Sequence, residues 1–148
     1  MQETKIRFIK LDPKAQMPTY GSEFAAGADL YAVLEKEITI EPGQTVMIGT
    51  GIACEIPIGF AGLIYARSGL ACKKGLAPAN KVGVVDSDYR GEIKIALHNH
   101  GTDAQVVGSG ERIAQLVITP FIRGVFEEAE TLEETDRGEG GFGSSGRF

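Results

Sequence analysis

Six consecutive residues near the middle of the chain combine two carboxylates, a hydroxyl, an aromatic ring and a guanidinium: Asp86-Ser87-Asp88-Tyr89-Arg90-Gly91. The preceding apolar run, Val82 to Val85, is typical of the end of a buried strand. Short Asp and Ser side chains bond nearby backbone N–H groups, which indicates a turn. Glu92 to Ile95 then alternates as a returning strand would. The pattern predicts a β-hairpin with its chemical groups at the tip.

Three interpretations of this tip stay open on the segment alone. The first is an ordinary polar turn, to which such a composition is well suited. The second is a calcium loop of the EF-hand type, which opens with the same Asp-x-Asp-x-x-Gly spacing. It fails because Arg90 and Leu97 stand where that loop needs oxygen ligands. The third is a catalytic tip, with Asp86 as a base and Tyr89 as a flat wall.

Two further stretches could bind anions. Arg67-Ser68-Gly69 places a guanidinium, a hydroxyl and amide groups at the start of a predicted short helix, with Ser68 as its cap. In the tail, Arg137 precedes a glycine- and serine-rich run, Gly140 to Gly146, that resembles a phosphate cradle but lacks the Lys-Ser/Thr pair of a Walker A loop. Each stretch also has a structural interpretation: a helix cap with a surface arginine, and a flexible tail.

Isolated polar residues are weaker candidates. Gln115 could bond a ligand, but as a lone amide it is expected to be structural. His98 and His100 lie on one strand face, yet no third histidine or neighbouring cysteine completes a zinc site, so a surface or interface role is expected. The cysteines, Cys54 and Cys72, form no metal-type pair and fit a reducing compartment.

The elements that must position these groups are strands. Alternating and β-branched runs predict them at residues 4–10, 37–40, 45–56, 60–66, 92–99, 104–107, 112–121 and 124–128. Residues 67–75 are the one convincing helix, with Gly75 suited to its end. The pattern indicates an all-β sandwich or barrel over residues 1–130, followed at 131–148 by a flexible glycine-rich tail.

Composition and net charge limit the classes of binding partner that can be expected. The chain has 148 residues and a net charge of −5, which disfavours a nucleic-acid backbone as the main partner but not a small phosphorylated ligand. The N-terminus has no apolar signal region and no run approaches membrane-spanning length. A cytoplasmic protein with no membrane partner is expected.

Five segments, taken in order and spacing, resemble the motifs of the trimeric deoxyuridine triphosphate nucleotidohydrolases (dUTPases). They are Ala26-Gly27-Ala28-Asp29-Leu30, Arg67-Ser68-Gly69-Leu70-Ala71, Gly83-Val84-Val85-Asp86-Ser87-Asp88-Tyr89-Arg90-Gly91, Gly110-Glu111-Arg112-Ile113-Ala114-Gln115-Leu116 and Arg137-Gly138-Glu139-Gly140-Gly141-Phe142-Gly143-Ser144-Ser145-Gly146. The resemblance implies a jelly-roll-like (β-clip) fold and a homotrimer whose sites lie at subunit interfaces. It also implies hydrolysis of dUTP to dUMP and pyrophosphate with Mg²⁺ on the triphosphate, which limits uracil incorporation into DNA and supplies dUMP.

For the nucleoside, the resemblance assigns four residues. Asp86 matches the carboxylate that activates the attacking water, which is sound chemistry because water is a poor nucleophile at neutral pH. Tyr89 matches the ring under the deoxyribose, where no room is left for a 2′-hydroxyl. Asn80 matches the uracil-reading position, and Val85 is a further substrate contact.

For the triphosphate, the resemblance assigns residues from three of the segments: Arg67, Ser68, Gly69, Gln115, Arg137, Gly143, Ser144 and Ser145. Phe142 matches a lid that stacks on the base. Asp29 matches an acid near the water shell of the metal, so an outer-sphere role is expected. Ser145 stands where threonine is common in the motif, and it keeps the hydroxyl.

Two other functions compete. The dCTP deaminases resemble dUTPases in fold and trimeric plan but carry a glutamate at the position that Ala96 holds here, and deamination needs an acid/base group beside the ring. A non-catalytic nucleotide-binding module on the same scaffold is the second. Asp86 and Arg137 favour the hydrolase, because a binder could dispense with a water-activating carboxylate.

Overall fold

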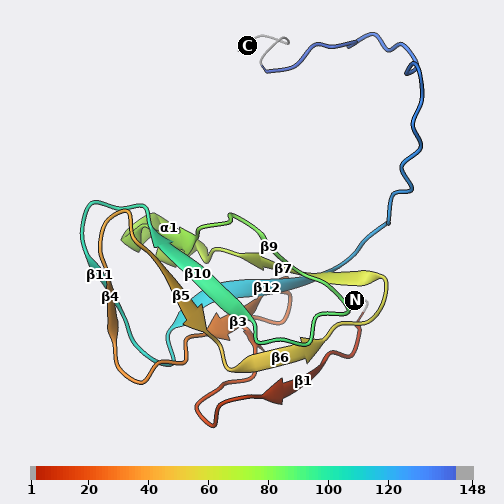
Figure 1. Ribbon diagram of the computed structural model, residues 1–148. Helices are drawn as coiled ribbons and strands as arrows, with labels where there is room; N and C mark the ends of the chain where they lie inside the picture. The colour runs from red at the N-terminus through yellow and green to blue at the C-terminus, as the bar shows by residue number, and fades with distance from the viewer. Residues whose placement is uncertain (1–2, 143–148) are drawn as a thin grey trace.

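The computed structural model describes residues 3–142, which form twelve short strands and one helix. The elements, shown in Figure 1, are β1 (Arg7–Lys10), β2 (Thr19–Tyr20), β3 (Ala28–Tyr31), β4 (Ile38–Ile40), β5 (Thr45–Gly49), β6 (Ile52–Glu55), β7 (Phe60–Tyr65), α1 (Ser68–Lys74), β8 (Leu76–Pro78), β9 (Gly83–Val85), β10 (Lys94–Asn99), β11 (Gln105–Val107) and β12 (Arg112–Pro120). The predicted all-β class with one short helix is confirmed.

The strands form several small antiparallel sheets around one core. The largest has the order β2-β3-β12-β7-β9, and β5-β10-β8 forms a second. Two strand pairs, β1-β6 and β4-β11, extend the body at its margins. Buried side chains from both larger sheets and both pairs meet in the interior: Leu30, Ile40, Ile48, Ile52, Ile64, Leu97, Val107 and Ile113. These neighbouring sheets bury their apolar faces against one another, as a sandwich requires.

The predicted hairpin at residues 82–95 is wrong in its pairing. β9 pairs with β7, whereas β10 pairs with β5 and β8, so the turn after Val85 joins two different sheets. The eight residues that connect β9 to β10, residues 86–93, are too many for a tight two-residue turn, and they let the strands diverge. This divergence leaves space between β9 and β10.

The single strand predicted at residues 45–56 is in fact two strands, β5 and β6, which belong to two different sheets. β5 ends at Gly49 and β6 begins at Ile52. Gly51 between them has φ +63°, a left-handed conformation that glycine adopts without steric cost. The chain therefore turns sharply at this point, which we call the 49–52 bend.

The chain after β12 leaves the body. Figure 1 shows it running away from the sheets and curving back at its far end. No strand forms among the described residues of this arm, so the strand predicted at 124–128 is wrong for the single chain. Its apolar side chains are exposed: Phe121, Ile122, Val125, Phe126, Leu132 and Phe142. A strand needs a neighbour for its backbone groups, and the body of the chain offers none to the arm.

Candidate active site

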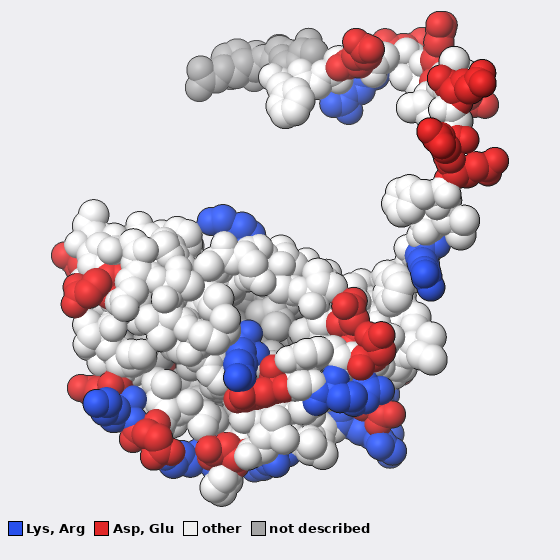
Figure 2. All heavy atoms as spheres, in the orientation of Figure 1, with Lys and Arg blue, Asp and Glu red and all other residues white. Residues whose placement is uncertain are grey.

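A pocket of about 300 Å³ opens where β9 and β10 diverge. Figure 2 shows a hollow on this face, with charged side chains at its rim. Four predicted site residues line the pocket together: Asn80, Val85, Asp86 and Tyr89. The structure thus collects the predicted nucleoside contacts in one cavity.

Other lining residues had no signal in the sequence. They are Met47, Ile64, Pro78, Glu92, Lys94 and Ile95. Met47, for example, reaches the pocket because β5 pairs with β10 in a register that places it opposite Ala96. Ala96 lines the pocket as well, so the residue that disfavours a deaminase lies where a base could bind.

Asp86 directly follows β9 and is exposed. The turn after it is closed by other groups: Tyr89 N–H donates to the Asp86 carbonyl at 3.1 Å, and the Arg90 guanidinium donates to the carbonyls of Ser87 and Tyr89. Within residues 3–142, neither a hydrogen bond nor an ion pair engages the Asp86 carboxylate. It is therefore free to accept a proton from water at the pocket mouth.

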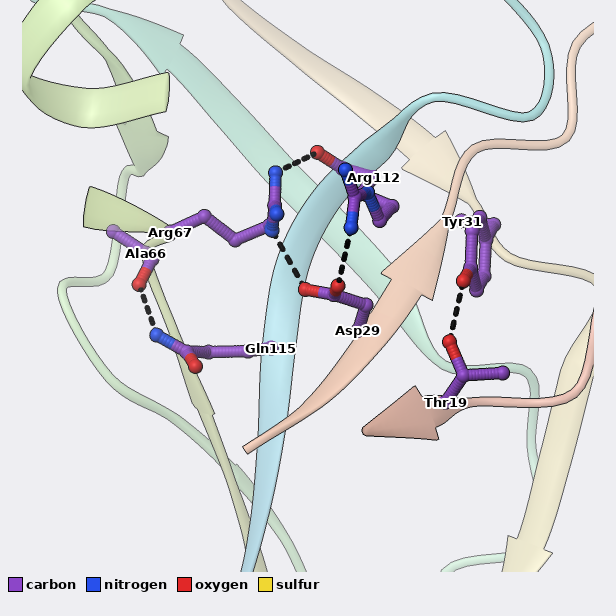
Figure 3. A network of polar contacts seen from close by, with 7 residues as sticks. All are labelled: Thr19, Asp29, Tyr31, Ala66, Arg67, Arg112 and Gln115. Atoms are coloured by element: carbon purple, nitrogen blue, oxygen red, sulfur yellow. Dashed lines mark hydrogen bonds and ion pairs between the residues drawn. The ribbon is translucent and has the colours of Figure 1, made fainter. Parts of the chain in front are cut away.

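Asp29 holds two arginines on the largest sheet. Its Oδ1 accepts Nε–H of Arg67 at 2.6 Å and its Oδ2 accepts Nη1–H of Arg112 at 3.2 Å (Figure 3). The carboxylate is nearly buried, with 11% of its side chain exposed. Charge-assisted bonds in such a setting fix both guanidinium planes.

The central strand β12 explains why these residues meet. Gln115 on β12 lies between Asp29 of β3 and Tyr65 of β7, and Arg67 comes two residues after β7 ends. The register of β12 against β3 shifts between Arg112 and Ala114, which is where Arg112 aims its side chain toward Asp29. The adjacent strands β3, β12 and β7 thus position the predicted phosphate-binding segment, Arg67 to Gly69.

The predicted N-cap of α1, Ser68, is wrong by one residue. Arg67 is the N-cap, with no side-chain capping bond, and Ser68 is the first helical residue with its hydroxyl exposed. Gly75 ends the helix in the left-handed conformation, φ 66°, as predicted. Gly69 is exposed, and within residues 3–142 no atom lies within 4 Å of the place that a Cβ would take there.

Gln115 has a structural role in the single chain. Its side-chain amide donates to the carbonyl of Ala66 at 2.8 Å, immediately before Arg67. Gly27 packs so closely against this side chain that a Cβ there would collide with Oε1. Gln115 therefore holds the backbone that leads into the Arg67 segment, and its expected phosphate contact stays a prediction.

Comparisons with known proteins agree with this geometry. A family model described as dUTPase matches residues 13–146. The chain belongs to the dUTPase family. A deoxyuridine 5′-triphosphate nucleotidohydrolase of Desulfitobacterium hafniense is 52% identical over 145 residues, covering 97% of this chain and 96% of that protein. The protein of the same name from Syntrophotalea carbinolica is 48% identical over 146 residues, with 99% of both chains covered. Among solved structures, a dUTPase of Staphylococcus bacteriophage 80alpha with dUpNHpp has a TM-score of 0.86 at 28% identity, covering 97% of this chain and 99% of that one.

The described part of the predicted lid of this dUTPase does not line the pocket of its own chain. Arg137 bonds within the arm, donating from Nε to the carbonyl of Gly140 at 2.7 Å, and Phe142 is fully exposed. The arm that follows β12 runs away from the body (Figure 1). Gly143, Ser144 and Ser145 lie outside the described residues.

The donor set of this dUTPase does not cage a metal. Within residues 3–142, no group of three or more His, Cys, Asp or Glu side chains is placed to hold an ion. Asp29 faces two guanidinium groups, which leaves no room for a direct bond to a dication. A Mg²⁺ ion bound mainly by triphosphate oxygens and water fits these residues, because it needs no protein cage.

His98 and His100 of this dUTPase pack edge to face with ring centroids 4.3 Å apart. His98 Nδ1 also bonds Thr45 Oγ1 at 2.7 Å. Desolvation, then the charges of Lys81 and His98, lower the pKa of His100.

None of the described helices is long and apolar enough to span a membrane.

Proposed function

We propose that this dUTPase hydrolyses dUTP at the pocket between β9 and β10, with Asp86 as the general base. Asp86 takes a proton from water while the water oxygen bonds the α-phosphorus. The bond between the α-phosphorus and the bridging oxygen breaks, so dUMP and pyrophosphate leave. Placing the nucleophile in line supplies most of what the protein can contribute to phosphoryl transfer.

One observation carries this proposal. Asp86 is the acid in the pocket whose carboxylate stays unengaged among the described residues, whereas Glu92 is held by the Gly51 N–H and lies near Lys94. A general base needs a free lone pair within reach of its water. Asp86 therefore fits that role and Glu92 does not.

Substrate choice follows from the other pocket residues. Asn80 offers an amide that can donate and accept toward the uracil edge, and Val85 is a buried apolar neighbour. Tyr89 presents a ring that would pack on the deoxyribose and leave a 2′-hydroxyl without space or partner. Ala96 supplies only a methyl group, which does not support ring deamination.

The triphosphate would bind along the Arg67 segment. Asp29 fixes the Arg67 guanidinium, and the Ser68 hydroxyl and Gly69 amide are open to solvent beside it. Members of the family use Mg²⁺. The ion would enter on the triphosphate and neutralise part of its charge, with Asp29 limited to contacts through water.

The homotrimer is part of the proposal. The arm exposes apolar side chains that a single chain leaves in water, and it carries Arg137 and Phe142 far from its own pocket. In a trimer, residues 131–148 of one copy would close the pocket of another, with Arg137, Gly143, Ser144 and Ser145 on the phosphates and Phe142 on the base.

The free thiols of Cys54 and Cys72 fit a cytoplasmic location.

A four-substrate assay tests the function. The protein is incubated with Mg²⁺ and dUTP, dCTP, dTTP or UTP, and pyrophosphate and ammonia are measured. Pyrophosphate from dUTP alone is the expected result. Ammonia from dCTP would instead show a deaminase, and tight binding of dUTP without turnover would show a binding module.

A further inference from the structure

Tyr89 is held in place by two neighbours, and we infer that these neighbours, Gly91 and Glu92, determine how strictly the enzyme rejects ribonucleotides. The inference rests on the proposed function and concerns the same pocket. It assigns positioning roles to two residues that need not touch the substrate.

Gly91 makes room for the Tyr89 ring. A Cβ at Gly91 would lie 2.6 Å from Tyr89 Cζ and 2.9 Å from Cε2, and it would also collide with the hydroxyl oxygen. Its φ lies outside the left-handed region, so glycine is not required there by the backbone. It is required by the ring, which occupies the space that any side chain would take.

The hydroxyl of Tyr89 is also tethered. It donates to the backbone carbonyl of Glu92 at 2.9 Å. Tyr89 as a residue is 45% exposed, so packing alone does not immobilise its side chain. The Gly91 surface and the Glu92 carbonyl together hold the ring folded back over the turn.

The Glu92 end of this tether is rigid. Its Oε1 accepts the Gly51 N–H at 2.9 Å, and its Oε2 lies 3.5 Å from Lys94 Nζ. Gly49 approaches the carboxylate so closely that a Cβ would collide with it. Only 26% of the Glu92 side chain is exposed. The side chain is therefore clamped into the 49–52 bend.

The next residue, Ile93, is fixed to the same bend through its backbone. Its carbonyl accepts the Thr50 N–H at 3.2 Å and the Thr50 hydroxyl at 2.7 Å, and its N–H donates to Ile52 at 2.8 Å. Thr50 is buried, so water does not compete for these bonds. The carbonyl that receives the Tyr89 hydroxyl thus has little freedom.

These contacts connect the bend to the pocket in an unbroken series. The bend fixes Glu92, Glu92 and Gly91 fix Tyr89, and Tyr89 forms the wall beside the sugar. Discrimination between deoxyribose and ribose needs a wall that does not yield to one added hydroxyl. A tethered ring meets that need, and a ring free to rotate away does not.

Gly91→Ala is the direct test, scored as the ratio of kcat/KM for dUTP to that for UTP. A displaced ring should lower this ratio at least about tenfold, mainly through better use of UTP. Gly21→Ala is the matched control, because a Cβ at Gly21 meets nothing within 4 Å and its φ is ordinary. The control should keep the wild-type ratio.

Two milder variants keep the test decisive if Gly91→Ala does not fold. Tyr89→Phe keeps the ring but removes the tether, and Glu92→Gln weakens the clamp. Tyr89→Phe should lower the ratio about fivefold, the effect expected from one lost hydrogen bond. Glu92→Gln keeps an oxygen that accepts the Gly51 N–H but loses the charge that faces Lys94, so it should lower the ratio by less, about twofold. Folded variants that all keep the wild-type ratio would overturn the inference. A wild-type protein that does not hydrolyse dUTP would instead overturn the proposed function.

Discussion

The Asp29 carboxylate lies between two cations, and its shorter bond, 2.6 Å, joins Oδ1 to Nε of Arg67. These residues are 38 positions apart in the chain and meet because β3 and β7 flank β12. Arg67 begins the segment proposed to bind the triphosphate. An anion-binding arginine is thus oriented by a nearly buried acid.

The first prediction concerns Asp29→Asn. The amide cannot pair both guanidinium groups, so we expect Arg67 to lose its orientation and the KM for dUTP to rise about tenfold or more. Steady-state kinetics measure this. We also expect a loss of about 1–3 kcal/mol in unfolding free energy, below the range for fully buried pairs because Arg112 is half exposed.

A titration with Mg²⁺ separates this account from a metal-binding role. If Asp29 acts by orienting Arg67, raising the Mg²⁺ concentration should leave the KM of the variant high. Full rescue by Mg²⁺ would contradict the orienting role. Glu35→Gln is a suitable control, because its pair with Lys14 is exposed and should change unfolding free energy by less than about 0.5 kcal/mol.

The second prediction concerns the arm. Deleting residues 137–148 should leave the proposed homotrimer intact and lower kcat/KM for dUTP at least about a hundredfold, because the proposed lid residues are removed. Light scattering and pyrophosphate release measure the two effects. Normal turnover by the truncated protein would show that the tail has no catalytic part.

Mixing two variants of the proposed homotrimer tests whose pocket the arm serves. The truncated chain keeps Asp86, and a full-length Asp86→Asn chain keeps the arm, so each should have only low activity alone. Refolded together, they should regain activity if the arm of one copy closes the pocket of another. Activity no higher than the sum of the separate proteins would contradict exchange between copies.

The third prediction concerns the two thiols. Burial raises the pKa of Cys54, whereas Cys72 is exposed on α1. A raised pKa leaves less thiolate at a given pH, and the thiolate is the reactive form. Iodoacetamide at pH 8 should therefore label Cys72 and spare Cys54 in the folded protein, as peptide mass spectrometry would show. Equal labelling in the folded state would contradict the placement of β6, and both should react in urea.

Local patterns predicted the strands well, because each alternation reports which face of its own segment is buried. Residues 60–66 and 112–121 became β7 and β12 almost unchanged. The pairing partner of each strand could not be predicted from the local sequence pattern. The turn at Asp86 was predicted to join paired strands, and it joins two sheets because β9 and β10 bond other neighbours.

The site residues likewise fall into two groups: those that a local motif predicts and those whose role depends on tertiary contacts. Asp86 and Tyr89 were recognisable from the motif in which they stand, and Asn80 from its place shortly before that motif; the pocket gathers all three. The roles of Gly91 and Glu92 were not recognisable, since they depend on contacts with a ring and with the 49–52 bend. Such contacts follow from register and side-chain packing, which no single segment encodes.

The account depends most on Asp86 as the base. The direct measurement is pyrophosphate release from Mg·dUTP by Asp86→Asn, beside Asp88→Asn in the same turn as the matched control. The amide cannot take the proton from water, so kcat should fall at least about a thousandfold while dUTP binding, measured by calorimetry, stays within a few fold. Asp88→Asn should keep most of the wild-type kcat. Release at the wild-type rate by Asp86→Asn would contradict the central claim.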